Sequence, residues 1–226
     1  LNSEKSEKSE SCKNNYFFSE PTPHDEILVQ LLEQFSKIDF ESLAFPKTDN
    51  VTESDKSRLK EKHFLVLSIE NVRDVAEKNK WGLCKNHDFI YLYNGSYWAN
   101  IDKDSFQKFL GEAAERMEVP KFSAKHYLFR ERLFKQFLSV AYLQAPDANK
   151  DLVCINLKNG TFEITPEGTK MRAFNAVDFI TYQLPFEYDP EAQAPIFQAY
   201  LNRVLPDKQR QNVLSEYLGF VFTKNG

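Results

Sequence analysis

The stretch INLKNG, residues 155–160, followed by ITYQLPFEYDPEAQAP, residues 180–195, decides the fold that we expect for this chain. Apolar residues lead into an Asn-Gly pair, which supplies the positive φ angles of a tight β-hairpin turn. Together with the return segment TFEI, this pair predicts a hairpin over about residues 152–164. A Tyr-Asp-Pro turn signal at 188–190 then predicts an extended arm that ends just before a helix.

A second Asn-Gly pair lies upstream, between the aromatic segments FIYLY at 89–93 and SYWANI at 96–101. It predicts another β-hairpin over about residues 89–101. Helical patterns occupy the intervals between and after the hairpins, at about residues 105–117, 123–143, 195–205 and 208–222. Because helices alternate with hairpins rather than with single strands, we predict an α+β fold, mainly helical, with two β-hairpins and two C-terminal helices.

The chain divides into three parts. Residues 1–24 are rich in Ser, Glu, Lys and Asn, and we expect a disordered tail because few apolar side chains are present to offset the entropy of ordering. Residues 25–82 are predicted to form a helical lead-in of three helices, the second starting near residue 54 and the third capped by Asn71. Residues 83–226 are assigned to the main domain.

The composition limits the possible classes of function. With 42% hydrophobic and 14% aromatic residues, a chain of 226 residues can bury a substantial core. A net charge of −4 argues against coating nucleic acid with the whole surface, but it permits a local basic face. The three cysteines are far apart, which favours a reducing intracellular compartment. No apolar run approaches the roughly 18 residues of a membrane span, so we expect a soluble cytoplasmic protein without membrane contact.

Catalytic chemistry has little support in the sequence. A phosphate-binding loop needs several glycines followed by Lys-Ser or Lys-Thr, and no such run is present. Asp102 and Asp104 form a DxD pair that could hold the divalent metal of a primase, but their place between a hairpin and a helix favours helix capping. Cys84 and His87 have the spacing of half a zinc site, without a second pair in reach. We therefore predict no catalytic residue, no metal ligand and no cofactor for this chain.

One segment carries a pattern that suggests binding: KFSAKHYLFRERLFKQFLSVAYL, residues 121–143. On one continuous helix, at about 100° per residue, its basic side chains fall within an arc of about 80°, opposite an apolar face. These candidate nucleic-acid-binding residues are Lys121, Lys125, Arg132 and Lys135. Their contacts with phosphates would be salt-sensitive and independent of base sequence. The same stripe is also compatible with an ordinary solvated face, or with contact to an acidic surface on a neighbouring subunit.

Other side chains near this stripe and in the first hairpin allow two interpretations each. Arg130 projects into the apolar face of the helix, so we expect it to extend towards solvent or to meet a buried carboxylate. The aromatic residues of the first hairpin could stack on bases, but alternation along the strands favours packing into the core. These residues are Tyr91, Tyr93, Tyr97 and Trp98.

The order of INLKNG, ITYQLPFEYDPEA and finally LSEYLGF, residues 214–220, resembles the domain that precedes the motor in phage, plasmid and poxvirus-type primase–helicases of helicase superfamily 3. The likeness covers about residues 60–226, and the hairpin YNGSYW is similar to an aromatic hairpin near the start of that domain. The resemblance implies a non-catalytic domain that helps to assemble a ring and to organise DNA entry. In that family ATP and Mg²⁺ belong to the motor, so we expect this chain to be a fragment of a longer protein.

The expected partners are therefore DNA and further copies of the same protein, within a replication protein of a mobile genetic element. Two alternatives stay open. The first is a protein–protein interaction module that never touches DNA, and the second is a metal-dependent primase built around Asp102 and Asp104. The fragment alone is not expected to be catalytic, whereas its parent protein is expected to act as an ATP-dependent DNA helicase or primase.

Overall fold

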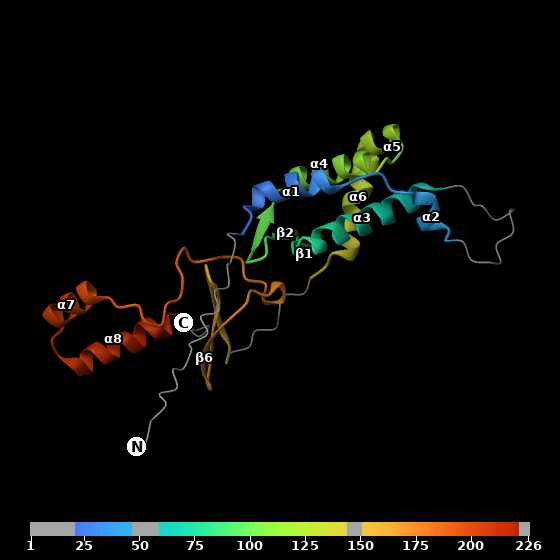
Figure 1. The fold of residues 1–226 in the computed structure, drawn as a ribbon. Helices are drawn as coiled ribbons and strands as arrows, with labels where there is room; N and C mark the ends of the chain where they lie inside the picture. Colours follow the sequence, from blue (N-terminus) through green and yellow to red (C-terminus); the bar gives the residue numbers. More distant parts are fainter. Residues whose placement is uncertain (1–20, 47–58, 144–150, 222–226) are drawn as a thin grey trace, which may run out of the picture.

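The computed structural model describes residues 21–46, 59–143 and 151–221 of the chain (Figure 1). Most of the predicted tail at 1–24 and the predicted helix start near residue 54 lie outside these ranges. The described residues form a mainly helical α+β fold with two three-stranded antiparallel sheets, which confirms the predicted fold class.

A helical layer occupies the N-terminal two thirds of the chain. Its helices are α1 (His24–Gln34), α2 (Phe40–Ala44), α3 (Glu61–Lys78), α4 (Lys103–Arg116), α5 (Lys121–Lys125) and α6 (Tyr127–Val140). They share one hydrophobic core, whose fully buried side chains include Ile27, Leu31, Ile69, Phe106, Leu133 and Phe137. The lead-in helices α1 to α3 therefore pack on the same core as α4 and α6.

Helix α3 differs from its prediction. One continuous helix replaces the two that were expected, of which the second was to begin at Asn71; Asn71 lies inside α3 and is not a cap. The physical reason is burial: Ile69, Val72 and Ala76 are each 1% exposed and lie on one face of the helix. Packing of that face outweighs the weak preference of Asn for a helix terminus.

The first sheet contains β1 (Gly82–Asn86), β2 (Phe89–Tyr93) and β3 (Trp98–Ile101), in that order. Pairing of Tyr93 with Trp98 leaves a four-residue loop, so the predicted two-residue turn is wrong. The Asn94 side chain holds this loop, since its Oδ1 accepts hydrogen bonds from the amides of Ser96 and Tyr97, both at 3.0 Å. Ile90 and Leu92 of β2 face the helical core.

The second sheet contains β4 (Val153–Leu157), β5 (Gly160–Thr165) and β6 (Gly168–Arg172), again in chain order. Leu157 pairs with Gly160, so the two turn residues are 158 and 159, one position earlier than predicted. Gly160 has a φ of +140°, and a Cβ there would lie 2.5 Å from the carbonyl oxygen of Arg172. Only glycine fits both demands, which explains why it begins the return strand.

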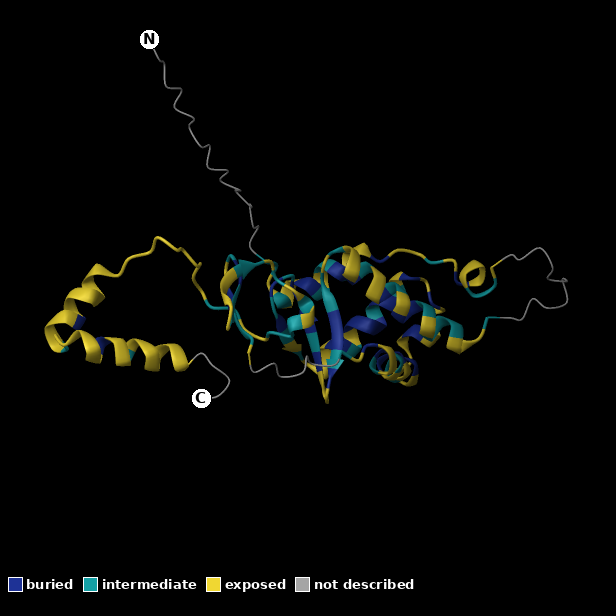
Figure 2. Ribbon diagram, turned by 90° about the horizontal axis from the view of Figure 1, so that it is seen from below, coloured by how far each residue is buried: buried dark blue, intermediate teal, exposed yellow. Residues whose placement is uncertain are grey.

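After β6 the chain forms a short 3-10 helix, η2 (Ala176–Asp178), and an arm that reaches α7 (Pro195–Val204) and α8 (Lys208–Phe220). These two helices confirm the predicted C-terminal pair. They lie beyond the second sheet, away from the helical layer (Figure 1), and most of their residues are exposed (Figure 2). In the described part of the chain, no helix has both the length and the apolar character needed to cross a membrane.

Candidate nucleic-acid interface

The four candidate basic residues do not lie on one helix. His126 has an extended backbone, with φ −74° and ψ 132°, and it separates α5 from α6. Its amide donates to the carbonyl oxygen of Ser123, and its own carbonyl accepts from Phe129 and Arg130, so the break leaves these backbone groups paired. The predicted continuous helix over residues 123–143 is therefore wrong at His126.

The structure places each candidate residue on one of two helices. Lys121 and Lys125 lie on α5, whereas Arg132 and Lys135 lie on α6. The four side chains consequently form two basic pairs, not the single arc that a straight helix would give. All four residues are exposed or partly exposed at the surface.

Carboxylates accompany three of these cations. The distance from the ammonium or guanidinium nitrogen to the carboxylate oxygen is 3.7 Å for Lys125–Glu115 and 2.7 Å for both Arg132–Glu61 and Lys135–Glu131. The hydrogen bond from Lys135 lowers the pKa of the Glu131 carboxyl. Among the described residues Lys121 enters no ion pair. Exposed ion pairs of this kind contribute little to stability and exchange readily with other anions.

Arg130 has a structural role: of the two outcomes expected for it, it meets a carboxylate, that of the partly buried Glu115. Its Nη2 lies 2.9 Å from Glu115 Oε1, and its Nε donates to the carbonyl oxygen of Ala124 at 3.1 Å. The guanidinium passes directly over Gly111, where a Cβ would lie 2.5 Å from the Arg130 Nε. Arg130 therefore connects α6 with both α4 and α5, and its contact with Ala124 spans the break at His126.

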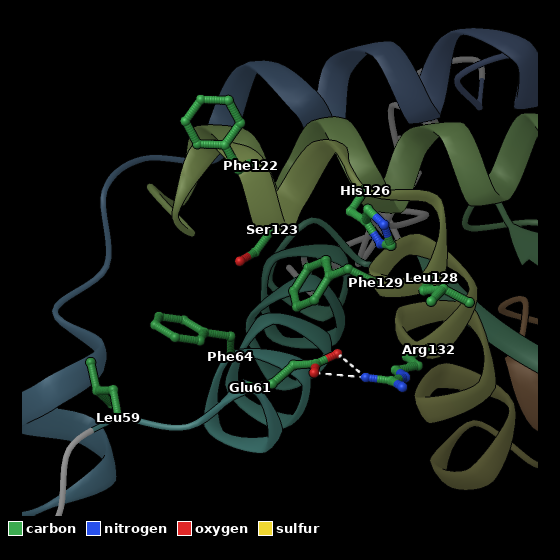
Figure 3. A pocket seen from close by; sticks show the side chains of 9 residues that line it. All are labelled: Leu59, Glu61, Phe64, Phe122, Ser123, His126, Leu128, Phe129 and Arg132. Atoms are coloured by element: carbon green, nitrogen blue, oxygen red, sulfur yellow. Dashed lines mark hydrogen bonds and ion pairs between the residues drawn. The ribbon is translucent and has the colours of Figure 1, made fainter.

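A groove of about 550 Å³ opens beside the break, between the start of α3, α5 and α6 (Figure 3). The ion pair of Glu61 with Arg132 lies at its α3–α6 side, and Phe64 and Phe129 contribute apolar wall (Figure 3). The remaining lining residues are Leu59, Phe122, Ser123, His126 and Leu128. The groove thus combines apolar surface with polar groups on two sides, Ser123 and His126 on one and the Glu61–Arg132 pair on the other (Figure 3).

Two aromatic rings next to the break at His126 are strongly exposed, and one of them, Phe122, also lines the groove. Phe122 on α5 is 90% exposed, and Tyr127 at the start of α6 is 70% exposed. The sequence pattern did not single out either ring. For Phe122 the reason is that a continuous helix would turn it towards the apolar face. The only signal in the sequence was their alternation with Lys121 and Lys125 in KFSAKHY.

Two of the four aromatic residues of the first hairpin, Tyr93 and Trp98, are buried, and the other two, Tyr91 and Tyr97, are partly exposed. Trp98 is 3% exposed and Tyr93 is 7% exposed, and the Trp98 indole Nε1 donates to the carbonyl oxygen of Ala176 at 2.8 Å. Tyr91 packs on Phe179 with ring centroids 5.0 Å apart. Tyr97 contacts the ring of His24. Tyr91, Tyr93 and Trp98 thus pack between the first sheet and the start of the arm, whereas Tyr97 packs against α1.

Of the acidic pair that follows the first hairpin, Asp102 caps α4 and Asp104 lies in its first turn. Asp102 is the N-cap of α4, since its Oδ2 accepts the amide hydrogen of Ser105 at 2.9 Å, and this bond lowers the pKa of the Asp102 carboxyl. Burial raises the pKa of the Cys84 thiol to about 12. Within the described ranges no three His, Cys, Asp or Glu side chains gather closely enough to hold a metal ion.

The two halves of the opening motif lie side by side. The arm runs along β4: the amide of Leu184 donates to Asn156 O at 2.9 Å, and the amide of Lys158 donates to Phe186 O at 3.0 Å. The side chain of Gln183 adds a hydrogen bond to Leu157 O at 3.1 Å. INLKNG and ITYQLPFEYDP are therefore hydrogen-bonded to each other, which explains physically why they occur together.

Asn156 lies at the centre of this junction and is fully buried. Its Nδ2 donates to the carbonyl oxygens of Ser96 at 3.0 Å and Tyr182 at 3.1 Å, and its Oδ1 accepts from the Thr161 hydroxyl at 3.1 Å. One amide side chain thus connects the loop of the first sheet, the arm and the second sheet. Because every polar atom of this side chain is paired, the site fixes the relative position of these elements.

A second connection lies at the base of the arm. Arg172 contacts Glu163 at 2.6 Å and Asp178 at 2.8 Å, and these carboxylates raise the pKa of its guanidinium. Phe179, which follows Asp178, has a φ of +49° and packs on Trp98 with ring centroids 5.7 Å apart. The arm is therefore attached to the second sheet by charge and to the first sheet by aromatic packing.

Residues 71–206 match the protein family described as D5 N terminal like. The match spans more than half of the chain, so the chain belongs to this family, which comprises the N-terminal domain of D5-like primase–helicase proteins. Comparison with curated proteins and with solved structures gives no significant match.

Proposed function

We propose that this chain is the domain before the ATPase motor of a mobile-element DNA primase–helicase, where it contacts DNA without sequence preference and aids ring assembly. ATP and Mg²⁺ are assigned to the motor of the parent protein. Family membership supports the link to replication. The observation that supports the DNA contact is the group of exposed cations on the consecutive helices α5 and α6, in a chain whose net charge is −4.

The contact would be made by phosphates on the four exposed cations. Lys121 is the first anchor because no carboxylate in the described structure pairs with it. Lys125, Arg132 and Lys135 have side chains 54%, 54% and 68% exposed, so a phosphate can replace the carboxylate beside each of them. Each cation that neutralises a phosphate releases counterions, and binding should therefore weaken steeply as salt rises.

The test measures DNA binding of charge-reversed variants. We would titrate a fluorescein-labelled DNA with the wild type, with Lys121→Glu/Lys125→Glu and with Arg132→Glu/Lys135→Glu at several salt concentrations. Both double variants should bind more weakly and should show a smaller slope of log affinity against log salt, by about 0.7–0.9 for each phosphate that is no longer neutralised. Unchanged affinity and slope in both would contradict the DNA role.

Lys108→Glu is the matched control for these variants. Lys108 is exposed on α4 and forms an i,i+4 ion pair with Glu112, as Lys135 does with Glu131 on α6. Its reversal changes the net charge of the protein by the same amount per residue but lies outside the proposed interface. Binding should therefore change much less in Lys108→Glu than in either double variant.

A second candidate function is an interaction module that docks subunits and never touches DNA. The observation that favours it is the exposed apolar surface of the C-terminal helices, where Ile196 is 86%, Tyr200 61% and Tyr217 64% exposed. Large exposed apolar side chains of this kind mark interaction surfaces. Light scattering of the parent protein would separate the two roles. Loss of the ring after Lys121→Glu/Lys125→Glu, with DNA affinity of the remaining subunits unchanged, would favour this module.

A further inference from the structure

We infer that Phe122 and Tyr127 stack on unpaired bases, so that the ligand of the proposed interface is single-stranded nucleic acid and not duplex DNA. This inference rests on the proposed DNA contact and specifies its substrate class. It follows from the break at His126, from the exposure of the two rings and from the groove that Phe122 helps to line.

The break at His126 turns Phe122 into solvent. On a continuous helix, residues seven apart return to nearly the same face, so Phe122 would lie over Phe129. In the structure Phe129 is 3% exposed and Phe122 is 90% exposed. A large apolar ring held in water costs free energy, and the fold holds it there through the contacts of Arg130 with Glu115 and Ala124.

The two exposed rings alternate with cations along one short segment. Lys121 precedes Phe122, and Lys125 lies two residues before Tyr127. Aromatic side chains beside a basic track are the arrangement with which proteins bind single strands, because every base offers a π face and every nucleotide a phosphate. In a duplex the faces of the bases are stacked on one another, so these rings would find no partner there.

The groove gives one base a place to enter. Its volume of about 550 Å³ accommodates a nucleobase, with Phe64 and Phe129 as apolar wall. In the described part of the chain neither the Ser123 hydroxyl nor the His126 ring makes a side-chain hydrogen bond, so both can face the edge of a base. Arg132 lies at the same groove and can contact the phosphate that follows.

The test compares single-stranded and duplex DNA on the same variants. We would measure the affinity of the full chain for fluorescein-labelled oligo(dT) and for a duplex of equal length. Phe122→Ala and Tyr127→Ala should each weaken oligo(dT) binding about 5- to 150-fold, as expected when one ring no longer stacks on a base, and should change duplex binding less than about twofold. Phe122→Trp should retain binding, and its added fluorescence should be quenched by oligo(dT).

Phe89→Ala is the control, since Phe89 is a 54% exposed ring on β2, outside the interface. The inference is overturned if Lys121→Glu/Lys125→Glu weakens binding while Phe122→Ala and Tyr127→Ala bind oligo(dT) like the wild type. The proposed DNA contact would survive that result. The DNA contact and the inference both fail if Lys121→Glu/Lys125→Glu and Arg132→Glu/Lys135→Glu bind both DNAs like the wild type. If Phe122→Ala alters only the mass measured by light scattering, the rings contact a subunit and the inference is likewise overturned.

Discussion

The side chain of Asn159 and the backbone of Tyr188 exchange two hydrogen bonds: Asn159 Nδ2 donates to Tyr188 O at 2.8 Å, and Tyr188 N donates to Asn159 Oδ1 at 2.9 Å. The amide of Asn159 therefore substitutes for a strand neighbour and holds the arm at the turn of the second sheet. Only Asn offers a donor and an acceptor at this reach. Contact with the arm, and not only the geometry of the turn, therefore explains why Asn is present at position 159 of the motif INLKNG.

Replacing Asn159 by Ala should release the arm near Tyr188. Both hydrogen bonds are removed while β4 and β5 stay paired, so we expect the local opening free energy to fall by about 0.5–1.5 kcal/mol for each bond. Hydrogen exchange at the amides of residues 186–188 should become faster, with little change in β5. Asn100→Ala, at an exposed position of β3, is the control. Equal exchange rates at residue 188 in wild type and Asn159→Ala would disprove the attachment.

Replacing Asn156 should destabilise the whole fold. Asn156→Leu keeps the volume of the side chain but leaves the partners at Ser96, Tyr182 and Thr161 without their bonds. A buried polar group left unpaired costs about 1–3 kcal/mol, so the free energy of unfolding should fall by at least that amount. Thr161→Val removes only one of these bonds and should cost less. Urea unfolding measures both, and the reverse order would contradict the central role of Asn156.

The sequence predicted the hairpins because turn chemistry is local. Asn-Gly pairs identified both hairpins, β2–β3 and β4–β5, although in each hairpin the residues that form the turn differ from the predicted ones. Strands β1 and β6 were not predicted, since GLCKN and GTKMR carry little apolar alternation. Their strand structure comes from pairing with the neighbouring strands β2 and β5 across two-residue turns at 87–88 and 166–167, and not from an apolar pattern within their own residues.

The candidate interface was predictable in its charges but not in its shape. Lys121, Lys125, Arg132 and Lys135 stand out from the sequence, whereas the break at His126 has no Pro or Gly to announce it. The break is held by tertiary contacts, mainly of Arg130 with Glu115 and Ala124. The exposure of Phe122 follows from that break, so it could not be found from helical periodicity.

The network at Arg172 should make stability depend on pH. Hydrogen bonds from Arg172 and then Lys170 lower the pKa of the Glu163 carboxyl below its ordinary value of 4.5. Because the folded-state pKa is the lower one, the stabilisation is present above about pH 4.5 and is lost as the pH falls through the folded-state value. Urea unfolding at pH 7 and at pH 3 to 4 should show that Glu163→Gln is less stable than wild type at pH 7, with a smaller difference in acid. Glu216→Gln on α8 is the control. A difference that does not shrink would contradict this linkage.

Gly111 on α4 should be required only because Arg130 crosses it. A Cβ at residue 111 would lie 2.5 Å from the Arg130 Nε, so Gly111→Ala should destabilise the protein by about 1–3 kcal/mol through overpacking, despite the higher helix propensity of Ala. In the Arg130→Ala background the same change should be neutral or stabilising, because the crossing side chain is gone. Gly219→Ala on α8 is the matched control: its Cβ would meet no atom within 4 Å, and it should stabilise α8 by up to about 1 kcal/mol. Thermal or urea unfolding of the double-mutant cycle measures this coupling. If Gly111→Ala costs the same with and without Arg130, the crossing is not what requires glycine, and α6 is held to α4 by its apolar contacts alone.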